Sequence, residues 1–396
     1  MSTPLILALL AFAAAFLFAL IVGGWREAIE AAWPKNAVAT EGPQVERVSL
    51  LVPARNAART LTALLQDLHA QQWPKEALEV IVVDDGSEDG TAEQVREMGK
   101  RWPGLVLLKA EGKGKKDAIS QGVRRAQGEW VLLTDADARC GPLRVQRIMQ
   151  HVVGSALDLL LLPVETRAHG GAIQQLQADE QTALLGVGAG TALQGGAVLA
   201  NGANLAFRRS AFLAVGGYAG DTWASGDDMF LLQRMRKAGR QVGYLLHPDV
   251  LVTVDAEPTF AGFWSQRLRW AGKMRAMSGP GPWGALAGSM LPWFLLYTSC
   301  SFSLEEMMVQ RPLAILFLLS AAWLLWLLPL LALARTARRF LRASTDTAPL
   351  RWSDGSSLLS LLAFSLYAPV VALASLFVRP RWKGRKTGSP TRERGA

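Results

Sequence analysis

The chain has 396 residues, half of them hydrophobic, and a formal net charge of +9. The hydrophobic residues are concentrated in separate segments, so the composition favours a membrane protein with a soluble region over a fully soluble protein. The basic residues cluster beside these segments, where anionic lipid headgroups attract them, and this argues against nucleic acid as the partner. The two cysteines, Cys140 and Cys300, form no C-x-x-C pattern, so neither a disulfide scaffold nor a zinc site is supported.

The first predicted element is a membrane anchor in residues 1–24. Pro4 to Val22 carry no charge, and about 20 apolar residues are enough for a helix to cross the hydrocarbon core. A cleaved signal peptide is the alternative, but it would need a basic start and a cleavage site of small residues. Ser2 to Pro4 contain no basic residue and Trp25 to Glu27 follow the apolar run, so we expect an uncleaved transmembrane helix.

Residues 47 to about 162 alternate short apolar runs with helical stretches, the pattern of a parallel sheet covered by helices. The expected strands are Val48 to Val52, Leu78 to Val83, Leu105 to Leu108, Trp130 to Thr134 and Leu157 to Val164. The expected helices are Thr60 to Ala70, Thr91 to Arg101, Asp117 to Ala126 and Leu143 to Val153. In open sheets of this kind ligands bind beyond the carboxyl ends of the strands, where Asp84, Asp85, Asp135 and Asp137 fall.

The alternation weakens after Thr166 into helices and a glycine-rich segment. Residues 183–200 are uncharged but contain five glycines, so we interpret them as a loop or helix of the soluble domain. Asn201 to Asn204 precede an expected strand, and Asp227 to Lys237 predict a helix. Phe260 to Met277 are aromatic and basic, a composition typical of a helix in the membrane interface.

Three further spans are predicted at residues 283–303, 312–334 and 356–378, followed by a basic and disordered tail at 379–396. The arginine-rich loop after the second of these predicts that the large domain, residues 45–280, shares its cytoplasmic side. Pro369 leaves open whether the last segment crosses the membrane or forms a re-entrant hairpin. We therefore expect a multi-pass protein of the cell membrane with a cytoplasmic domain.

Several polar motifs have the residue types that nucleotide chemistry needs. Asp135 and Asp137 end an apolar strand, so their oxygens can reach the same hard cation. Asp84 and Asp85 stand before Gly86, and either acidic motif alone could be an ordinary polar turn. Lys115 lies beside glycine before a helix, where it can approach a phosphate, although a solvated basic loop has the same composition.

Two motifs lie in the second half of the soluble region. Asp227 and Asp228 stand at a helix start, where carboxylates act as ordinary caps or where one can serve as a general base. Gln266 to Trp270 hold Arg and Trp, which also favour the membrane interface as simple anchors. The sequence has no P-loop and no G-x-S-x-G, and its histidines lack metal-ligand spacing, so NTPase and hydrolase functions have no support.

In order and spacing these motifs resemble the membrane-bound family 2 glycosyltransferases, the group of cellulose, chitin, hyaluronan and poly-N-acetylglucosamine synthases and ceramide glucosyltransferases. The resemblance covers about Arg47 to Lys273. The matching segments are Val52 to Asn56, Val83 to Ser87, Gly114 to Ala118, Asp135 to Asp137, Ser225 to Asp228 and Gln266 to Trp270. The sequence departs from the synthases at Asp227, where they usually have Glu, and this leaves the acceptor contact of that residue open.

The resemblance implies a GT-A-type nucleotide-diphospho-sugar transferase domain with a mostly parallel sheet, flanked by transmembrane helices. It implies an inverting hexosyl transfer from a nucleotide sugar, with a UDP-sugar as the expected donor, to a lipid or glycan acceptor, with Mg²⁺ or Mn²⁺. The implied sites are Pro53, Arg55, Asp84, Asp85, Lys115 and Asp135 for the nucleotide, and Asp135 and Asp137 for the metal. Asp228, with Asp227, is implied as the catalytic base, and Asn204, Gln266, Arg269 and Trp270 as the acceptor site.

Two alternatives to a single transfer stay open at this point. The protein could be one subunit of a processive polysaccharide synthase with an unknown partner subunit, because three C-terminal segments are few for a polymer channel. It could also be a non-catalytic scaffold, although no acidic motif is lost. A transporter is disfavoured, because the spans show neither repeated halves nor intramembrane charge.

Overall fold

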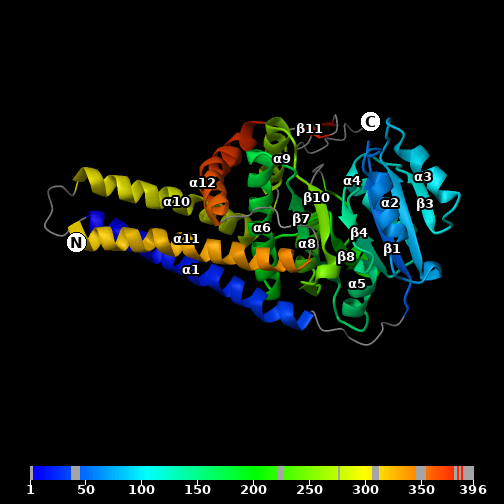
Figure 1. The fold of residues 1–396 in the computed structure, drawn as a ribbon, viewed down its shortest axis with the longest axis horizontal. Coiled ribbons are helices and arrows are strands. Elements are labelled where there is room, and N and C mark those ends of the chain that lie inside the picture. Colours follow the sequence, from blue (N-terminus) through cyan, green and yellow to red (C-terminus); the bar gives the residue numbers. More distant parts are fainter. Residues whose placement is uncertain are drawn as a thin grey trace.

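We describe the protein from a computed structural model. The structure describes residues 3–36, 45–221, 226–274, 277–305, 312–344, 354–378, 381–382 and 385–386. Figure 1 shows an α/β domain at one end of the molecule and long helices extending from it at the other. Ser225 of the predicted acidic motif and most of the predicted basic tail lie outside the described residues.

The centre of the α/β domain is a seven-stranded sheet with the order β3-β2-β1-β4-β8-β6-β9. Its strands are β1 (Val48–Ala54), β2 (Leu78–Asp84), β3 (Leu105–Lys109), β4 (Trp130–Leu133), β6 (Leu159–Leu161), β8 (Leu205–Arg208) and β9 (Val242–Tyr244). Only β8 runs antiparallel to its neighbours, β4 and β6. The predicted GT-A-type fold with a mostly parallel sheet is therefore confirmed.

Helices cover both faces of this sheet, so its central strands are buried on both sides. The helices of the first half are α2 (Leu61–His69), α3 (Thr91–Gly99), α4 (Lys115–Arg125) and α5 (Arg144–Val152), with a short 3-10 helix at Lys75–Ala77. Along β1, Leu50 and Val52 enter a core with α2 and α5, whereas Leu51 enters a second core with α4 and with the later helix α6 (Ala172–Leu193). Burial on both faces explains why the strands are continuous apolar runs rather than alternating ones.

The prediction of one continuous strand from Leu157 to Val164 was wrong, because this segment contains β6 and the start of a separate strand, β7 (Val164–Arg167). The chain leaves the main sheet after β6, and Pro163, which has no N–H to donate to a ladder, separates β6 from β7. β7 pairs with β10 (Val252–Asp255), which also pairs with β5 (Arg139–Cys140), to form a second sheet of three strands. This second sheet brings Thr166 and Asp255 to the same cavity as the acidic motifs.

The second half of the domain is mainly helical. It contains α6 (Ala172–Leu193), α7 (Arg209–Ala214), the 3-10 helix Pro248–Val250, α8 (Asp227–Lys237) and α9 (Phe260–Met274). The glycine-rich segment predicted as a loop or helix is a helix up to Leu193, the second half of α6. Its glycines allow close packing on long helices of the membrane region, because a Cβ on Gly186 would lie 2.9 Å from Leu333 Cγ.

The remaining long helices are α1 (Thr3–Asn36), α10 (Pro280–Glu305), α11 (Pro312–Ser344) and α12 (Asp354–Phe377). Among the described residues, three helical segments are long and apolar enough to cross a membrane: Thr3–Trp33, Leu313–Ser344 and Ser357–Phe377. The predicted span at 283–303 does form a helix, α10, but it is not one of the three. Figure 1 shows α1, α10 and α11 side by side, joined by a core that includes Ala11, Leu295 and Trp326. The strands β11 (Arg381–Trp382) and β12 (Arg385–Lys386) pair near the C-terminus.

We predict that Gly190→Ala loosens the contact between α6 and α1. A Cβ at this position would lie 2.9 Å from the Cα of Trp25, so the two backbones would have to separate. Overpacking of this kind costs about 1 to 3 kcal/mol, which a lower thermal midpoint of the purified protein in detergent would reveal. Gly188→Ala on the same helix is the control, because its Cβ would lie 3.7 Å from Leu199 Cβ, in ordinary contact. Equal midpoints for the two variants would contradict the predicted role of Gly190.

Candidate active site

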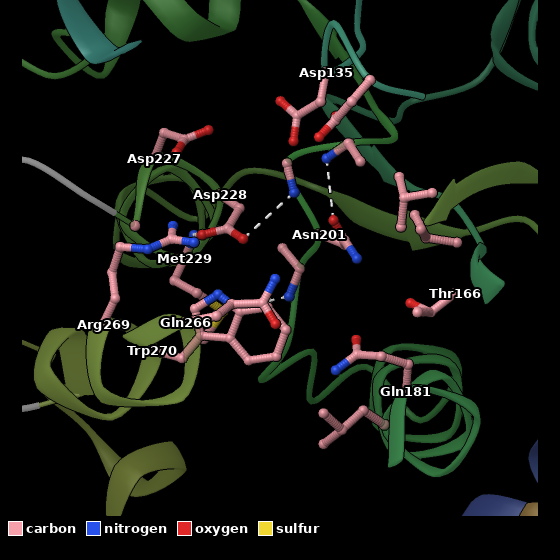
Figure 2. Close-up of a pocket in the computed structure, with 18 of the residues that line it drawn as sticks. Asp135, Thr166, Gln181, Asn201, Asp227, Asp228, Met229, Gln266, Arg269 and Trp270 are labelled. Atoms are coloured by element: carbon pink, nitrogen blue, oxygen red, sulfur yellow. Dashed lines mark hydrogen bonds between the residues drawn. The ribbon is translucent and has the colours of Figure 1, made fainter. Parts of the chain in front are cut away.

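A cavity of about 740 Å³ lies where the carboxyl edge of the main sheet meets α6, α8, α9 and α12. It is lined by all of the predicted site residues except Asp84 and Asn204, namely Pro53, Arg55, Asp85, Lys115, Asp135, Asp137, Asp227, Asp228, Gln266, Arg269 and Trp270. Figure 2 shows Asp135 on one side of the cavity, Asp227 and Asp228 beside it, and Gln266, Arg269 and Trp270 together on α9. The structure thus joins motifs that are far apart in the sequence.

The ends of β1 and β2 form one wall. The Arg55 guanidinium donates a hydrogen bond of 2.8 Å to the carbonyl oxygen of Asp85, and the Asp85 carboxylate accepts one of 3.0 Å from the N–H of Gly114. Asp84 has a different position from the predicted one: its carboxylate accepts the N–H of Ser87 at 3.1 Å and does not line the cavity. Asp84 therefore shapes the turn, and Asp85 is the carboxylate that reaches the cavity.

Lys115, at the start of α4, joins the strand-end carboxylates to those of α8. Its ammonium nitrogen lies 2.7 Å from Asp135 Oδ1 and 2.9 Å from Asp227 Oδ2. Burial alone would lower the pKa of Lys115, but the two carboxylates outweigh burial and raise it, so the ammonium group stays charged. The predicted phosphate-binding lysine therefore also holds two acidic motifs at a fixed separation.

Asp228 is held as an oriented carboxylate at the N-terminus of α8. Its Oδ1 accepts hydrogen bonds from the N–H of Met229 at 2.7 Å and from the Lys273 ammonium at 3.1 Å. Its Oδ2 accepts a longer bond of 3.3 Å from the N–H of Gly202, drawn as a dashed line in Figure 2. The left-handed backbone of Gly226, with φ of 87°, forms the turn that starts this helix.

The two adjacent carboxylates of α8 have opposite pKa shifts. Burial raises the pKa of Asp227, and the charges of Asp228 and Asp135 add to this increase, so together they outweigh the ion pair with Lys115. Burial also acts to raise the pKa of Asp228, but Lys273, Lys115 and the Met229 N–H outweigh it and lower the pKa. Asp228 is therefore ionised more readily than its neighbour Asp227.

Four of the α9 residues that line the cavity share one face of the helix. Gln266, Arg269, Trp270 and Lys273 follow the spacing i, i+3, i+4, i+7, which places them on the same side. We expected Lys273 only as a basic residue of an interfacial helix, so its contact with Asp228 was missed. The helical spacing was the signal that could have found it, because it continues the face defined by the other three.

Arg267 also lines the cavity, and it attaches α9 to the rest of the protein. Its guanidinium donates two hydrogen bonds to Glu180 Oε2 on α6, and the Tyr367 hydroxyl of α12 donates to the same oxygen at 2.7 Å. The guanidinium also lies 4.4 Å from the centre of the Trp270 ring, so it supports this aromatic wall of the cavity. Because the Arg267 side chain is only 4% exposed, it does not act as a snorkelling interface anchor.

Asn204, predicted as part of the acceptor site, does not line the cavity. The residue is fully buried, and its amide nitrogen donates to the carbonyl oxygens of Pro163 and Val250, both at 2.8 Å. Its amide oxygen accepts two hydrogen bonds from the buried guanidinium of Arg144. Every polar atom of the Asn204 side chain is thus engaged inside the protein, so this residue supports the floor beneath the cavity instead of forming it.

The carboxylates that line the cavity are too few to hold a divalent ion by themselves, so a bound phosphate group would have to supply further oxygen ligands. Within the described ranges, no cluster of three or more His, Cys, Asp or Glu side chains could hold a metal ion. Asp135 and Asp137 both line the cavity, and Mg²⁺-type ions often use one or two carboxylates and take their other ligands from water and phosphate. The residues therefore fit an ion that binds together with a phosphate ligand.

This combination of a mostly parallel sheet, carboxylates at its carboxyl edge and an acidic helix start defines a GT-A-type glycosyltransferase domain. Residues 49–215 match the model of Glycosyl transferase family 2, so the chain contains a glycosyltransferase domain of this family. The fold is also similar to that of a mannosyltransferase from Pyrobaculum calidifontis, solved with GDP-Man and Mn²⁺. The TM-score is 0.54 at 22% identity, over 92% of this chain and 98% of the other.

Curated relatives are similar in sequence to part of this chain. The chain is 25% identical over 232 residues to a poly-beta-1,6-N-acetyl-D-glucosamine synthase of Staphylococcus aureus (strain COL), which covers 58% of this chain and 54% of the relative. It is 25% identical over 236 residues to the synthase of the same name from Staphylococcus epidermidis, covering 59% and 56%. The chain thus spans about half the length of the curated relatives that it matches.

We predict that Asn204→Ala destabilises the protein and leaves substrate binding by the folded fraction unchanged. The substitution removes the acceptor of two hydrogen bonds from buried Arg144, and bonds to charged groups contribute about 1.5 to 3 kcal/mol. A thermal midpoint several degrees lower would be the readout, with Asn201→Ala on the cavity wall as the control. If Asn204→Ala had the thermal midpoint of the wild type and a raised KM for the acceptor, the prediction that Asn204 contacts the acceptor would be supported instead.

Proposed function

We propose that the protein transfers a sugar from a nucleotide sugar, with a UDP-sugar as the expected donor, to a hydroxyl of a membrane-associated lipid or glycan, with inversion. The observation that carries this proposal is the position of Asp228. Its carboxylate lies between the nucleotide-side residues and the α9 face, in a cavity that continues to α12. The family 2 domain and the names of the relatives support the reaction class.

On the donor side, Arg55 and Asp85 would contact the nucleoside, because both line the wall formed by the ends of β1 and β2. Asp135 and Asp137 would hold Mg²⁺ or Mn²⁺, which when bound neutralises charge on the diphosphate leaving group. Lys115 and Arg269 add positive charge at the same end of the cavity. Neutralising the leaving group in this way reduces what the catalytic base must contribute.

Asp228 would act as the general base of a single displacement. Its Oδ2, whose hydrogen bonds to described residues are the long ones to Gly202 and Lys273, would take the proton of the acceptor hydroxyl. The hydroxyl oxygen forms a bond to the anomeric carbon as the bond from this carbon to the diphosphate oxygen breaks, and the electron pair leaves with the diphosphate. Attack from the face opposite the leaving group inverts the configuration, so a second carboxylate nucleophile is not required.

The acceptor is proposed to enter from the membrane side. Phe364, Ala368 and Val371 of α12 line the same cavity as Trp270, and α12 includes one of the three segments able to cross a membrane. This arrangement favours an acceptor with an apolar part. The arginines that follow residues 312–334 favour a multi-pass protein whose catalytic domain faces the cytoplasm. The names of the relatives keep a processive synthase subunit as the second candidate, and the length of the product would separate the two.

We expect Asp228→Asn to reduce turnover by about 10² to 10⁴, the usual contribution of general base catalysis. The measurement is nucleotide release from a panel of labelled nucleotide sugars, using the purified full chain in vesicles with bacterial lipid extract. Glu97→Gln, which removes a carboxylate on the exposed face of α3, is the matched control and should behave as wild type. If wild type and Asp228→Asn release nucleotide equally slowly with every donor, the proposed activity is rejected.

We expect Asp137→Asn to weaken donor binding in the presence of Mg²⁺ or Mn²⁺ about tenfold or more, the usual range for a lost oxygen ligand or its support. Isothermal titration of the donor nucleotide with and without chelator measures this effect. In chelator the variant and the wild type should bind equally, because Asp137 then has no ion to hold. A variant with the same affinity as wild type under both conditions would remove the metal role from Asp137.

A further inference from the structure

We propose that Lys273 is a positioning residue for the catalytic base: it orients the Asp228 carboxylate and supplies its counter-charge from helix α9. This inference rests on the proposed function, in which Asp228 accepts the proton of the acceptor hydroxyl. The Lys273 ammonium lies 3.1 Å from Oδ1 and 3.5 Å from Oδ2 of Asp228. Together with the Met229 N–H it holds Oδ1, and Oδ2 is left with the weaker contacts that an incoming hydroxyl can replace.

The environment makes this ion pair effective. The side chains of Lys273 and Asp228 are 13% and 15% exposed, so solvent screens their attraction much less than it screens a surface pair. The stem of Lys273 passes closely over the start of α8, because a Cβ on Gly226 would lie 3.1 Å from Lys273 Cδ. A glycine at this point therefore permits the approach that brings the ammonium group to Asp228.

Other charged groups surround Asp228, and among them Lys115 also acts to lower its pKa. They are Asp227 on α8, Asp135 after β4, Lys115 and Lys116 on α4, Tyr218 and Asp221 after α7, and Arg269 on α9. Lys115 is paired with Asp135 and Asp227, and Lys116 is paired with Asp221. In the part of the chain that the structure describes, Lys273 is thus the cation within ion-pair distance of Asp228.

The sign of the effect follows from the charge of Lys273. A cation at this distance stabilises the ionised carboxylate and lowers the pKa of Asp228, against the effect of burial. Removing the cation raises this pKa, so at a given pH a smaller fraction of Asp228 is ionised and able to act as a base. Activity should be lost first at low pH and regained as the pH rises.

The test is the pH profile of kcat/KM for the full-length protein and for Lys273→Met. We expect the acidic limb of Lys273→Met to move upward by about one pH unit or more, with the KM for the donor unchanged. Lys273→Arg keeps the charge and should restore most of the wild-type profile. Lys237→Met, at the exposed C-terminal end of α8, is the control for loss of a lysine and should leave the profile in place.

A second measurement does not depend on turnover. Infrared difference spectra recorded across the pH range identify the protonated Asp228 carboxyl as the band that is missing in Asp228→Asn. In Lys273→Met this band should appear at a higher pH than in wild type. If the spectra shift and no donor is turned over, the positioning role stands and the proposed function fails. A uniform loss of activity without movement of the acidic limb or of the band overturns the positioning role and assigns Lys273 to packing alone.

Discussion

The balance of charge around one buried group of carboxylates is the constraint on which the rest of this structure depends. Asp135 follows β4, whereas Asp227 and Asp228 are neighbours at the start of α8, and the three carboxylates would repel one another without compensation. Lys115 pairs with the first two, and Lys273 pairs with the third. Since α4, α8 and α9 each contribute to these pairs, the charges determine where the helices stand relative to the sheet edge. Those positions in turn shape the cavity.

A second set of buried charges connects this site to the long apolar helices. The adjacent residues Asp179 and Glu180 on α6 each bind a different helix pair. Asp179 contacts Arg338 of α11 at 3.4 Å and accepts a hydrogen bond from Ser360 of α12 at 2.6 Å. Glu180 binds Arg267 of α9 and Tyr367 of α12. Breaking a buried ion pair is strongly destabilising, so these contacts hold α6 against α9, α11 and α12.

Most of the α/β domain was predictable from the sequence, because its strands and helices have strong local signals. The apolar runs that became β1, β2 and β4 are fully buried, β3 at the sheet edge is partly buried, and α8 has the same bounds as predicted. The segment from Leu157 to Val164 was mispredicted because strand propensity does not show which of two sheets a residue joins, and Pro163 separates them here. Among the site residues, the motifs next to strands and helix starts were found, because carboxylates in those places have recognisable spacing.

The sequence by itself determined the class of fold, the acidic and basic motifs and the apolar segments, because each depends on residues close together in the chain. Only the tertiary structure decided how those motifs are used. In the structure Asn204 points inward and accepts hydrogen bonds from Arg144. The Asp84 carboxylate binds the turn after β2, whereas Asp85 lines the cavity. Lys273 contacts Asp228, which lies 45 residues earlier in the chain. The physical reason is that burial and pairing of polar groups depend on contacts between distant segments. Helical spacing can place Lys273 on the same face of α9 as Gln266, but it does not show which residue that face meets.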